Sequence, residues 1–163
     1  MNEAIFFLSM NEFIVVNGEK IQIFDGILDL GWKKIKNLSD IVDFEKLGHL
    51  KGLILRENNL EFIPDSLCLL NSLKFLNIAG NRLSSLPKSI GNLISIETIN
   101  AEYNQLIRLP KSLGNLINLK ILNLSKNKLT TLPDKIGNLK SLEDLNLEYN
   151  ELNEIPESIG NLK

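Results

Sequence analysis

The sequence predicts an α/β fold built as a solenoid, a right-handed superhelix of β-strands and short α- or 3-10 helices with a parallel, concave sheet. The same asparagine returns every 23 residues, at Asn58, Asn81, Asn104, Asn127 and Asn150. Leucine, asparagine and isoleucine are over-represented, with 32, 21 and 20 of the 163 residues. A fixed period is typical of repeat architectures, in which coils stack because one unit cannot enclose a core.

Residues 1–26 lie outside the repeat, and we interpret them as an N-terminal cap. Within residues 13–24, two β-rich runs flank Asn17-Gly18, the dipeptide that most strongly favours a two-residue hairpin turn. We therefore expect a β-hairpin, which could cover the open apolar end of the first coil.

Residues 27–163 form the repeat array, which we divide into about six repeats. The frame is LxxLxLxxNxLxxLP, as in Leu119 to Pro133. Its alternation places two leucines on the core side of a short strand, because successive side chains point to opposite faces. The repeated asparagine follows the strand, where its amide can hydrogen-bond peptide groups of neighbouring coils. We expect a structural ladder of Asn58, Asn81, Asn104, Asn127 and Asn150.

The outer half of each coil has room for only a turn or two of α- or 3-10 helix. Its proline, such as Pro133, fixes φ and lacks an N–H, which suits a chain leaving the sheet. Its glycine, such as Gly137, is expected to permit a tight bend. The first coil is longer, and residues 39–47 place Ile41, Phe44 and Leu47 at helical intervals. This spacing predicts a helix on the convex side.

No evident capping segment follows the last coil, because the sequence stops where the next strand is expected. Terminal coils normally need a polar outer face. We expect either that the chain is part of a longer protein or that its last coil packs against another copy.

The second half of the repeat carries the motif LPxxIGNL, with small variations, at residues 86–93, 109–116, 132–139 and 155–162. With the frame above, these motifs resemble the leucine-rich repeat family, specifically its 23-residue intracellular, Ras-group-like class. The resemblance implies a regulatory or scaffolding role in intracellular signalling, with a small GTPase or another signalling protein as the partner. The five in-frame copies of LxxLxLxxNxLxxLP are a strong signal for the fold and a weak one for function.

We find no residue pattern for catalysis, a cofactor or a metal. The frame places the one histidine, His49, in an exposed loop, and we interpret the one cysteine, Cys68, as a small buried residue. The glycines are isolated and form no phosphate-binding loop. With 18 basic and 20 acidic residues, the chain lacks the sustained basic stripe of a nucleic-acid binder. The apolar start is too short to span a membrane, and the single cysteine favours a reducing compartment, so we predict a cytoplasmic location.

The solvent-facing side of the sheet remains as the predicted binding surface. Counting the repeated asparagine as position nine, positions three, five, seven, eight and ten should project from this side. The predicted partner-binding residues are Trp32, Arg56, Phe75, Asn77, Arg82, Asn100, Tyr103, Asn123, Lys126, Asn146, Glu148 and Tyr149. Aromatic and arginine side chains commonly anchor protein interfaces, and we expect Phe75, Tyr103 and Tyr149 to form a cluster. The position-five asparagines could either recognise a partner directly or form a surface ladder of amides bonded between neighbouring strands.

The sequence therefore predicts a non-catalytic module that binds a protein partner through its concave face. Two alternatives stay open. The chain could be the substrate-recognition arm of a larger enzyme, such as a GTPase, kinase or ubiquitin ligase. It could also be a structural repeat protein that self-associates through its C-terminal end.

Overall fold

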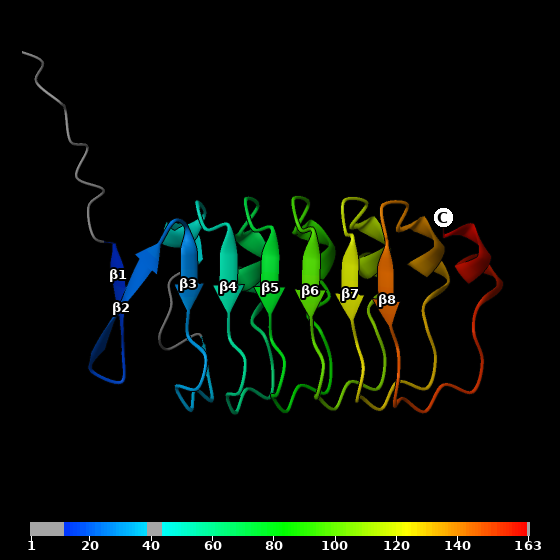
Figure 1. Ribbon diagram of the computed structural model, residues 1–163, viewed down its shortest axis with the longest axis horizontal. Coiled ribbons are helices and arrows are strands. Elements are labelled where there is room, and N and C mark those ends of the chain that lie inside the picture. Colours follow the sequence, from blue (N-terminus) through cyan, green and yellow to red (C-terminus); the bar gives the residue numbers. More distant parts are fainter. Residues whose placement is uncertain (1–11, 39–43, 163) are drawn as a thin grey trace, which may run out of the picture.

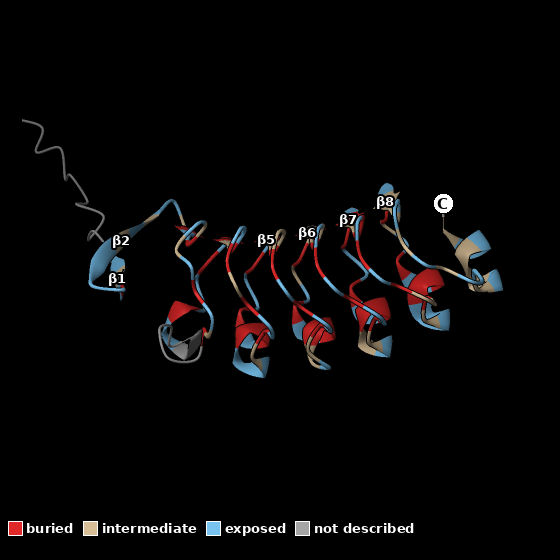
Figure 2. Cartoon of the chain, turned by 90° about the horizontal axis from the view of Figure 1, so that it is seen from below, coloured by how far each residue is buried: buried red, intermediate tan, exposed pale blue. Residues whose placement is uncertain are grey.

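The computed structural model describes residues 12–38 and 44–162. Within them, an eight-stranded sheet forms one layer and a row of 3-10 helices forms the other (Figure 1, Figure 2). The strands are β1 (Phe13–Val16), β2 (Glu19–Phe24), β3 (Ile27–Asp29), β4 (Gly52–Ile54), β5 (Phe75–Asn77), β6 (Thr98–Asn100), β7 (Ile121–Asn123) and β8 (Asp144–Asn146). The 3-10 helices are η1 (Phe44–Leu47), η2 (Asp65–Leu69), η3 (Ile90–Asn92), η4 (Lys111–Asn115), η5 (Asp134–Asn138) and η6 (Glu157–Asn161). The predicted solenoid is confirmed.

The hairpin of β1 and β2 opens the sheet. Its turn places Asn17 and Gly18 at φ 51° and 80°, the left-handed pair that a type I′ turn requires. Strand β2 then pairs antiparallel with β3, so that the hairpin and the array share one sheet. Val16 is buried, and Ile14 and Ile21 pack against the core. The predicted hairpin is confirmed, and it contributes apolar contacts to the first coil.

Strands β3 to β8 are parallel and in strict register, because equivalent residues of successive coils pair directly. The central residues of these strands form one row, Leu28, Leu53, Leu76, Ile99, Leu122 and Leu145. All of them except Leu145 are fully buried. Leu67, Leu113 and Ile136 of the 3-10 helices close the core from the outer side. Figure 2 shows the buried residues gathered between the two layers.

The repeated asparagines join each coil to the one before it. Asn104 Oδ1 accepts a hydrogen bond from the backbone N–H of Leu83 at 3.0 Å, and its Nδ2 donates to the carbonyl of Ile78 at 3.0 Å. The same pair of contacts is made by Asn58, Asn81, Asn127 and Asn150. Each of these amides therefore satisfies peptide groups that neither the strand nor the helix pairs.

The first coil has Lys33 in place of this asparagine. No coil precedes it in the sheet, and the backbone carbonyl of Lys33 instead accepts a hydrogen bond from Asn17 Nδ2 of the hairpin turn, at 3.1 Å. The hairpin is thus hydrogen-bonded to the backbone of the first coil at this position.

The glycines of the outer layer allow close contact between coils, which corrects the expectation of a tight bend. Gly91, Gly114 and Gly137 are absent from the positive-φ residues. A Cβ at any of them would overlap the backbone carbonyl oxygen of the next coil, at Ser112, Lys135 and Ser158 respectively. The prolines behave as expected, since Pro64, Pro110, Pro133 and Pro156 each stand directly before a 3-10 helix.

Two other expectations concern the early coils. The predicted convex helix at residues 39–47 lies partly outside the described residues, and residues 44–47 form the 3-10 helix η1. Cys68 is buried, with an exposed fraction of 2%, as predicted. Cys68 stands at the position where the later coils carry glycine. In the following coil, the 3-10 helix η3 has three residues, whereas η4 has five.

Candidate functional site

The concave face of the sheet consists of rows of side chains, because each frame position recurs in register from coil to coil. We define the strand-start row as Ile27, Gly52, Phe75, Thr98, Ile121 and Asp144. The asparagine row is Asn77, Asn100, Asn123 and Asn146. The left-handed row, just beyond the strands, is Trp32, Glu57, Gly80, Tyr103, Lys126 and Tyr149.

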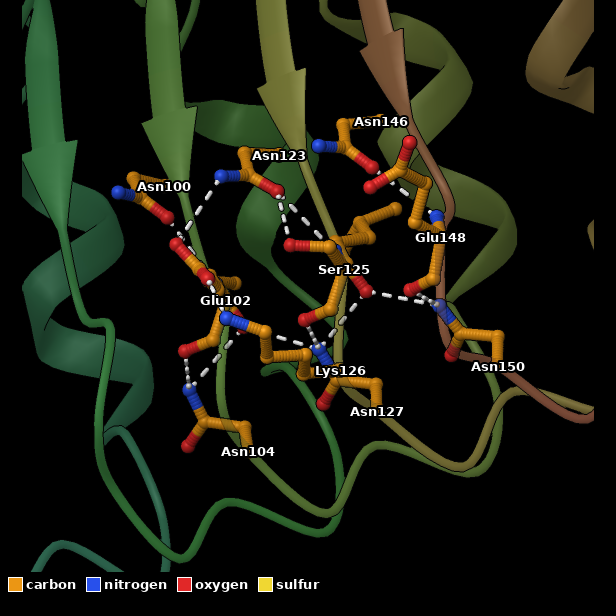
Figure 3. Close-up of polar contacts among 12 residues, drawn as sticks. Asn100, Glu102, Asn104, Asn123, Ser125, Lys126, Asn127, Asn146, Glu148 and Asn150 are labelled. Atoms are coloured by element: carbon orange, nitrogen blue, oxygen red, sulfur yellow. Dashed lines mark hydrogen bonds and ion pairs between the residues drawn. The ribbon is translucent and has the colours of Figure 1, made fainter.

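The asparagine row bonds mainly to its own backbone. Each Oδ1 accepts from the N–H two residues later, at 3.0 to 3.1 Å. One amide bonds to the neighbouring coil, where Asn123 Nδ2 donates to Glu102 Oε2 at 3.4 Å (Figure 3). Apart from this contact, the alternative of an inter-strand amide ladder is wrong. In the described residues the NH₂ groups of Asn77, Asn100 and Asn146 have no acceptor, so the row offers hydrogen-bond donors to solvent or to a partner.

The left-handed row takes its name from its backbone conformation. All six residues have φ between 53° and 65°. This conformation extends the hydrogen bonding beyond the strands, since Tyr103 N donates to Ser125 O at 3.1 Å and Lys126 N to Glu148 O at 2.8 Å. Glycine adopts such φ values freely, whereas a side chain there costs about 1 to 2 kcal/mol. Three of the six residues are nevertheless aromatic and project into solvent.

Lys126 is held between coils by Glu102. Its Nζ donates to Glu102 Oε1 at 2.9 Å, and Figure 3 shows the two side chains pointing toward each other. The same Nζ lies 5.0 Å from the centroid of the Tyr103 ring. The hydrogen bond to Glu102 is the main reason that the pKa of Lys126 is raised. Lys126 is therefore a fixed cation beside Tyr103.

A hollow opens where glycine interrupts the left-handed row. It has a volume of about 350 Å³ and is lined by Glu57, Asn58, Gly80, Asn81, Arg82 and Tyr103. Glu57 and Tyr103 stand on the coils to either side of Gly80, and Arg82 follows two residues after it. A second hollow, of about 460 Å³, lies where Trp32 meets the hairpin residues Lys20, Ile21 and Gln22.

The predicted site residues all project from the concave face, but they do not form one group. Phe75 belongs to the strand-start row, and Tyr103 and Tyr149 belong to the left-handed row with Lys126 between them. The two rows lie five residues apart along each coil, although each strand is only three residues long, and among the described residues none of the three rings contacts another. The expected cluster of Phe75, Tyr103 and Tyr149 is therefore wrong. Arg56, Arg82 and Glu148 are exposed and make no side-chain ion pair among the described residues.

Sequence reasoning did not select Glu57, Gly80 and Glu102 as site residues. Glu102 fixes Lys126, Gly80 opens the hollow, and Glu57 lies against that opening. The sequence does contain one signal for this hollow. Five of the six coils carry a residue with a side chain at position eight of the frame, whereas one coil carries glycine.

The residues with catalytic or ligating chemistry lie apart. His49 is exposed in its loop, with its Nε2 2.8 Å from Glu12 Oε2, and burial raises the pKa of the Cys68 thiol. Among residues 12–38 and 44–162, no three His, Cys, Asp or Glu side chains come together as a metal site requires. In the same ranges, the 3-10 helices all fall short of the length and apolar character that a membrane span needs.

Two family models match the chain. The model described as a leucine-rich repeat region matches residues 101–163. The model described as a leucine rich repeat matches residues 27–83 and 48–106. No curated protein matches the chain. Proteins with this fold generally mediate protein–protein interactions.

Solved structures from bacteria and plants share the fold. A leucine-rich repeat protein of Leptospira interrogans is 33% identical with a TM-score of 0.75, and the match covers 83% of this chain and 40% of that one. The ectodomain of the Arabidopsis thaliana receptor kinase GASSHO1/SCHENGEN3 is 30% identical with a TM-score of 0.72, covering 99% of this chain and 20% of that one. Listeria monocytogenes InlP is 28% identical with a TM-score of 0.70, covering 83% and 37%. This chain thus spans 40% or less of the length of these three structures.

Proposed function

Because the chain belongs to the leucine-rich repeat family, we propose that it is a non-catalytic module that binds a protein partner on the concave face of its sheet. The left-handed row and the asparagine row form the centre of this contact surface. The strand-start row contributes apolar contacts at its edge through Phe75 and Ile121.

The observation that carries the proposal is the exposure of aromatic side chains in a strained backbone conformation. Trp32, Tyr103 and Tyr149 expose 66%, 63% and 75% of their surface. At these positions the backbone favours glycine, so packing and local conformation give no reason for a large ring. Binding to a partner gives such a reason, because aromatic rings contribute much of the energy of protein interfaces.

The asparagine row and the solved relatives support the same proposal. Free NH₂ groups beside exposed rings can donate to the carbonyl or carboxylate oxygens of a bound polypeptide. Among the structural relatives, the Arabidopsis ectodomain was solved in complex with Casparian strip integrity factor 2.

We further propose that the module acts inside the cell, as a regulatory or scaffolding protein in signalling, with a small GTPase or a similar signalling protein as the partner. This setting is supported by the resemblance to the 23-residue intracellular class and by the single cysteine. This proposed cellular setting does not depend on which face of the module binds the partner.

The test is a pull-down from cell lysate with the wild-type module and two variants. The concave variant carries Phe75→Ala, Tyr103→Asn and Tyr149→Asn, because asparagine tolerates left-handed φ better than most residues with a side chain. The control carries Ile94→Ser and Ile117→Ser, which remove side chains that are 60% and 59% exposed in the loops between 3-10 helices and strands. Both variants should keep the wild-type melting temperature.

We expect at least one protein to be captured by the wild type and the control but not by the concave variant. The captured protein should then bind the purified module directly in a titration. If every captured protein also binds the concave variant, the concave face is not the binding surface and the proposal fails.

A further inference from the structure

We propose that the hollow at Gly80 is a specificity pocket that binds one basic side chain, a lysine or an arginine, of the protein partner. This inference rests on the proposed function, since it assigns a part of the same face to one feature of the partner. It assigns a role to Glu57, Gly80 and Arg82 that the fold itself does not require.

The hollow exists because one coil lacks a side chain at position eight. The neighbouring coils place Glu57 and Tyr103 there, and the row continues with Lys126 and Tyr149. Gly80 keeps the left-handed backbone, with φ 65°, and donates its N–H to Glu102 O at 3.0 Å, as Glu57, Tyr103 and Lys126 donate to the coil that follows each of them. The backbone is therefore unchanged, and the space that a side chain of this coil would occupy is open to the neighbouring Glu57 side chain.

A carboxylate without a partner lies in this space. A Cβ at Gly80 would sit 2.7 Å from Cδ of Glu57, so the Glu57 side chain leans over the glycine. In the described residues the Glu57 carboxylate has neither an ion pair nor a hydrogen bond, although Arg82 lines the same hollow. Its oxygens are left for water or for a ligand.

Tyr103, on the coil that follows Gly80, lines the same hollow and carries an electron-rich ring. Ring faces attract ammonium and guanidinium groups, and this ring already attracts one cation, since Lys126 Nζ lies 5.0 Å from its centroid. Because Lys126 is hydrogen-bonded to Glu102, its charge is largely balanced. A cation entering the hollow would meet a free carboxylate on one side and the ring on the other.

Other occupants would leave a charge unpaired. An apolar or aromatic side chain would remove water from Glu57 without replacing its hydrogen bonds, which is costly for a carboxylate. An acidic side chain would meet the same carboxylate at close range. A basic side chain pairs with Glu57, while exposed Arg82 at the rim remains free to donate to a carbonyl or carboxylate of the partner beside it.

The inference is tested by NMR titration of the ¹⁵N-labelled full chain with single amino-acid probes. The probes are N-acetyl-arginine amide and N-acetyl-lysine amide, with N-acetyl-citrulline amide as the uncharged control and N-acetyl-glutamate amide as the opposite charge. The readout is the shift of the Gly80, Glu57 and Tyr103 backbone amides.

Two variants alter the hollow: Glu57→Gln removes the charge, and Gly80→Tyr fills the space with the residue that two other coils carry in the same conformation. Glu148→Gln is the matched control, because Glu148 is an exposed carboxylate without an ion pair on the same face.

We expect the arginine or the lysine probe to shift the Gly80 amide saturably in the wild type and in Glu148→Gln. The shift should be absent in Gly80→Tyr and about ten-fold weaker in Glu57→Gln, as expected when a charged contact becomes neutral. If the citrulline or glutamate probe shifts Gly80 as strongly, if Glu57→Gln has no effect, or if neither basic probe shifts Gly80, the inference is overturned. These outcomes are independent of the pull-down, so the pocket can fail while the concave face still binds a protein. A failed pull-down with a positive titration would remove the proposed protein partner and leave only a pocket that binds basic side chains.

Discussion

Asn104 Nδ2 donates a hydrogen bond of 3.0 Å to the carbonyl oxygen of Ile78, 26 residues earlier in the chain. The same NH₂ group also lies 3.1 Å from the carbonyl of Ala101 in its own coil. One buried side chain thus binds the backbones of two coils, and the contact repeats along the array. These contacts between coils add to the stability that the buried leucines provide.

Asn104→Ala should lower the free energy of unfolding by about 3 kcal/mol, because it leaves several buried peptide groups without partners. Asn100→Ala is the control, since Asn100 accepts one bond from the N–H of Glu102 on the solvent side, and its loss should cost about 1 kcal/mol. Urea unfolding of the two variants measures the difference. Equal losses would show that the ladder is no more important than the surface row.

Gly114→Ala should lower the free energy of unfolding by about 1 to 3 kcal/mol, because the new methyl group would overlap the Lys135 carbonyl and push two coils apart. Gly160 is the matched control, since no described atom lies within 4 Å of a Cβ added there. Gly160→Ala should be neutral or stabilise by up to about 1 kcal/mol by restricting the unfolded chain. Thermal unfolding of both variants tests this, and a tolerated Gly114→Ala would contradict the role in close contact.

Glu97 should make stability depend on acid pH. Its carboxylate lies 2.7 Å from Lys120 Nζ and 3.2 Å from Lys74 Nζ, and these hydrogen bonds hold its pKa below the ordinary value of 4.5. Since the folded state favours the charged form, the contribution is fully present above the ordinary value and is lost as pH falls through the lowered pKa.

The measurement is the difference in urea midpoint between the wild type and Glu97→Gln across that range. We expect a difference at neutral pH that shrinks in acid, and that also shrinks in high salt because the groups are exposed. A difference that stays constant with pH would show that the two lysines do not stabilise the carboxylate.

Cys68 should be unreactive in the folded protein. Burial is the main cause of its raised pKa, with the nearby Asp65 charge adding to it and a hydrogen bond with Ser89 opposing it. Less thiolate is therefore present at neutral pH, and access is also limited. Alkylation by iodoacetamide should be far slower in the native protein than in urea, and its rate should rise as pH is raised above the ordinary thiol value. Equal rates in both states would place the thiol at the surface.

The local chemistry of the repeat explains which features were predictable from the sequence. The Asn17-Gly18 hairpin was predictable because a type I′ turn depends on the backbone preferences of two adjacent residues. The ladder through Asn127 was predictable because the turn after each strand leaves peptide groups that recur with the period and must be paired.

Other features depended on distances between coils, which no spacing along the chain contains. The repeated Gly137 was expected to bend the backbone, but its lack of a side chain serves contact with the next coil. Asn100 was expected to bond across strands in one alternative, yet its Oδ1 accepts a hydrogen bond from the N–H of Glu102 in its own coil, at 3.0 Å.

The sequence by itself determined the solenoid, the hairpin, the buried leucine rows and the face that is open to solvent, because these follow from the period and from the alternation of side chains in a strand. Only the tertiary structure decided that Lys126 is fixed by Glu102 and that Gly80 leaves a hollow beside a free carboxylate. Those relationships join side chains about 23 residues apart whose positions depend on how closely one coil packs on the next, and packing distance is a property of the folded array.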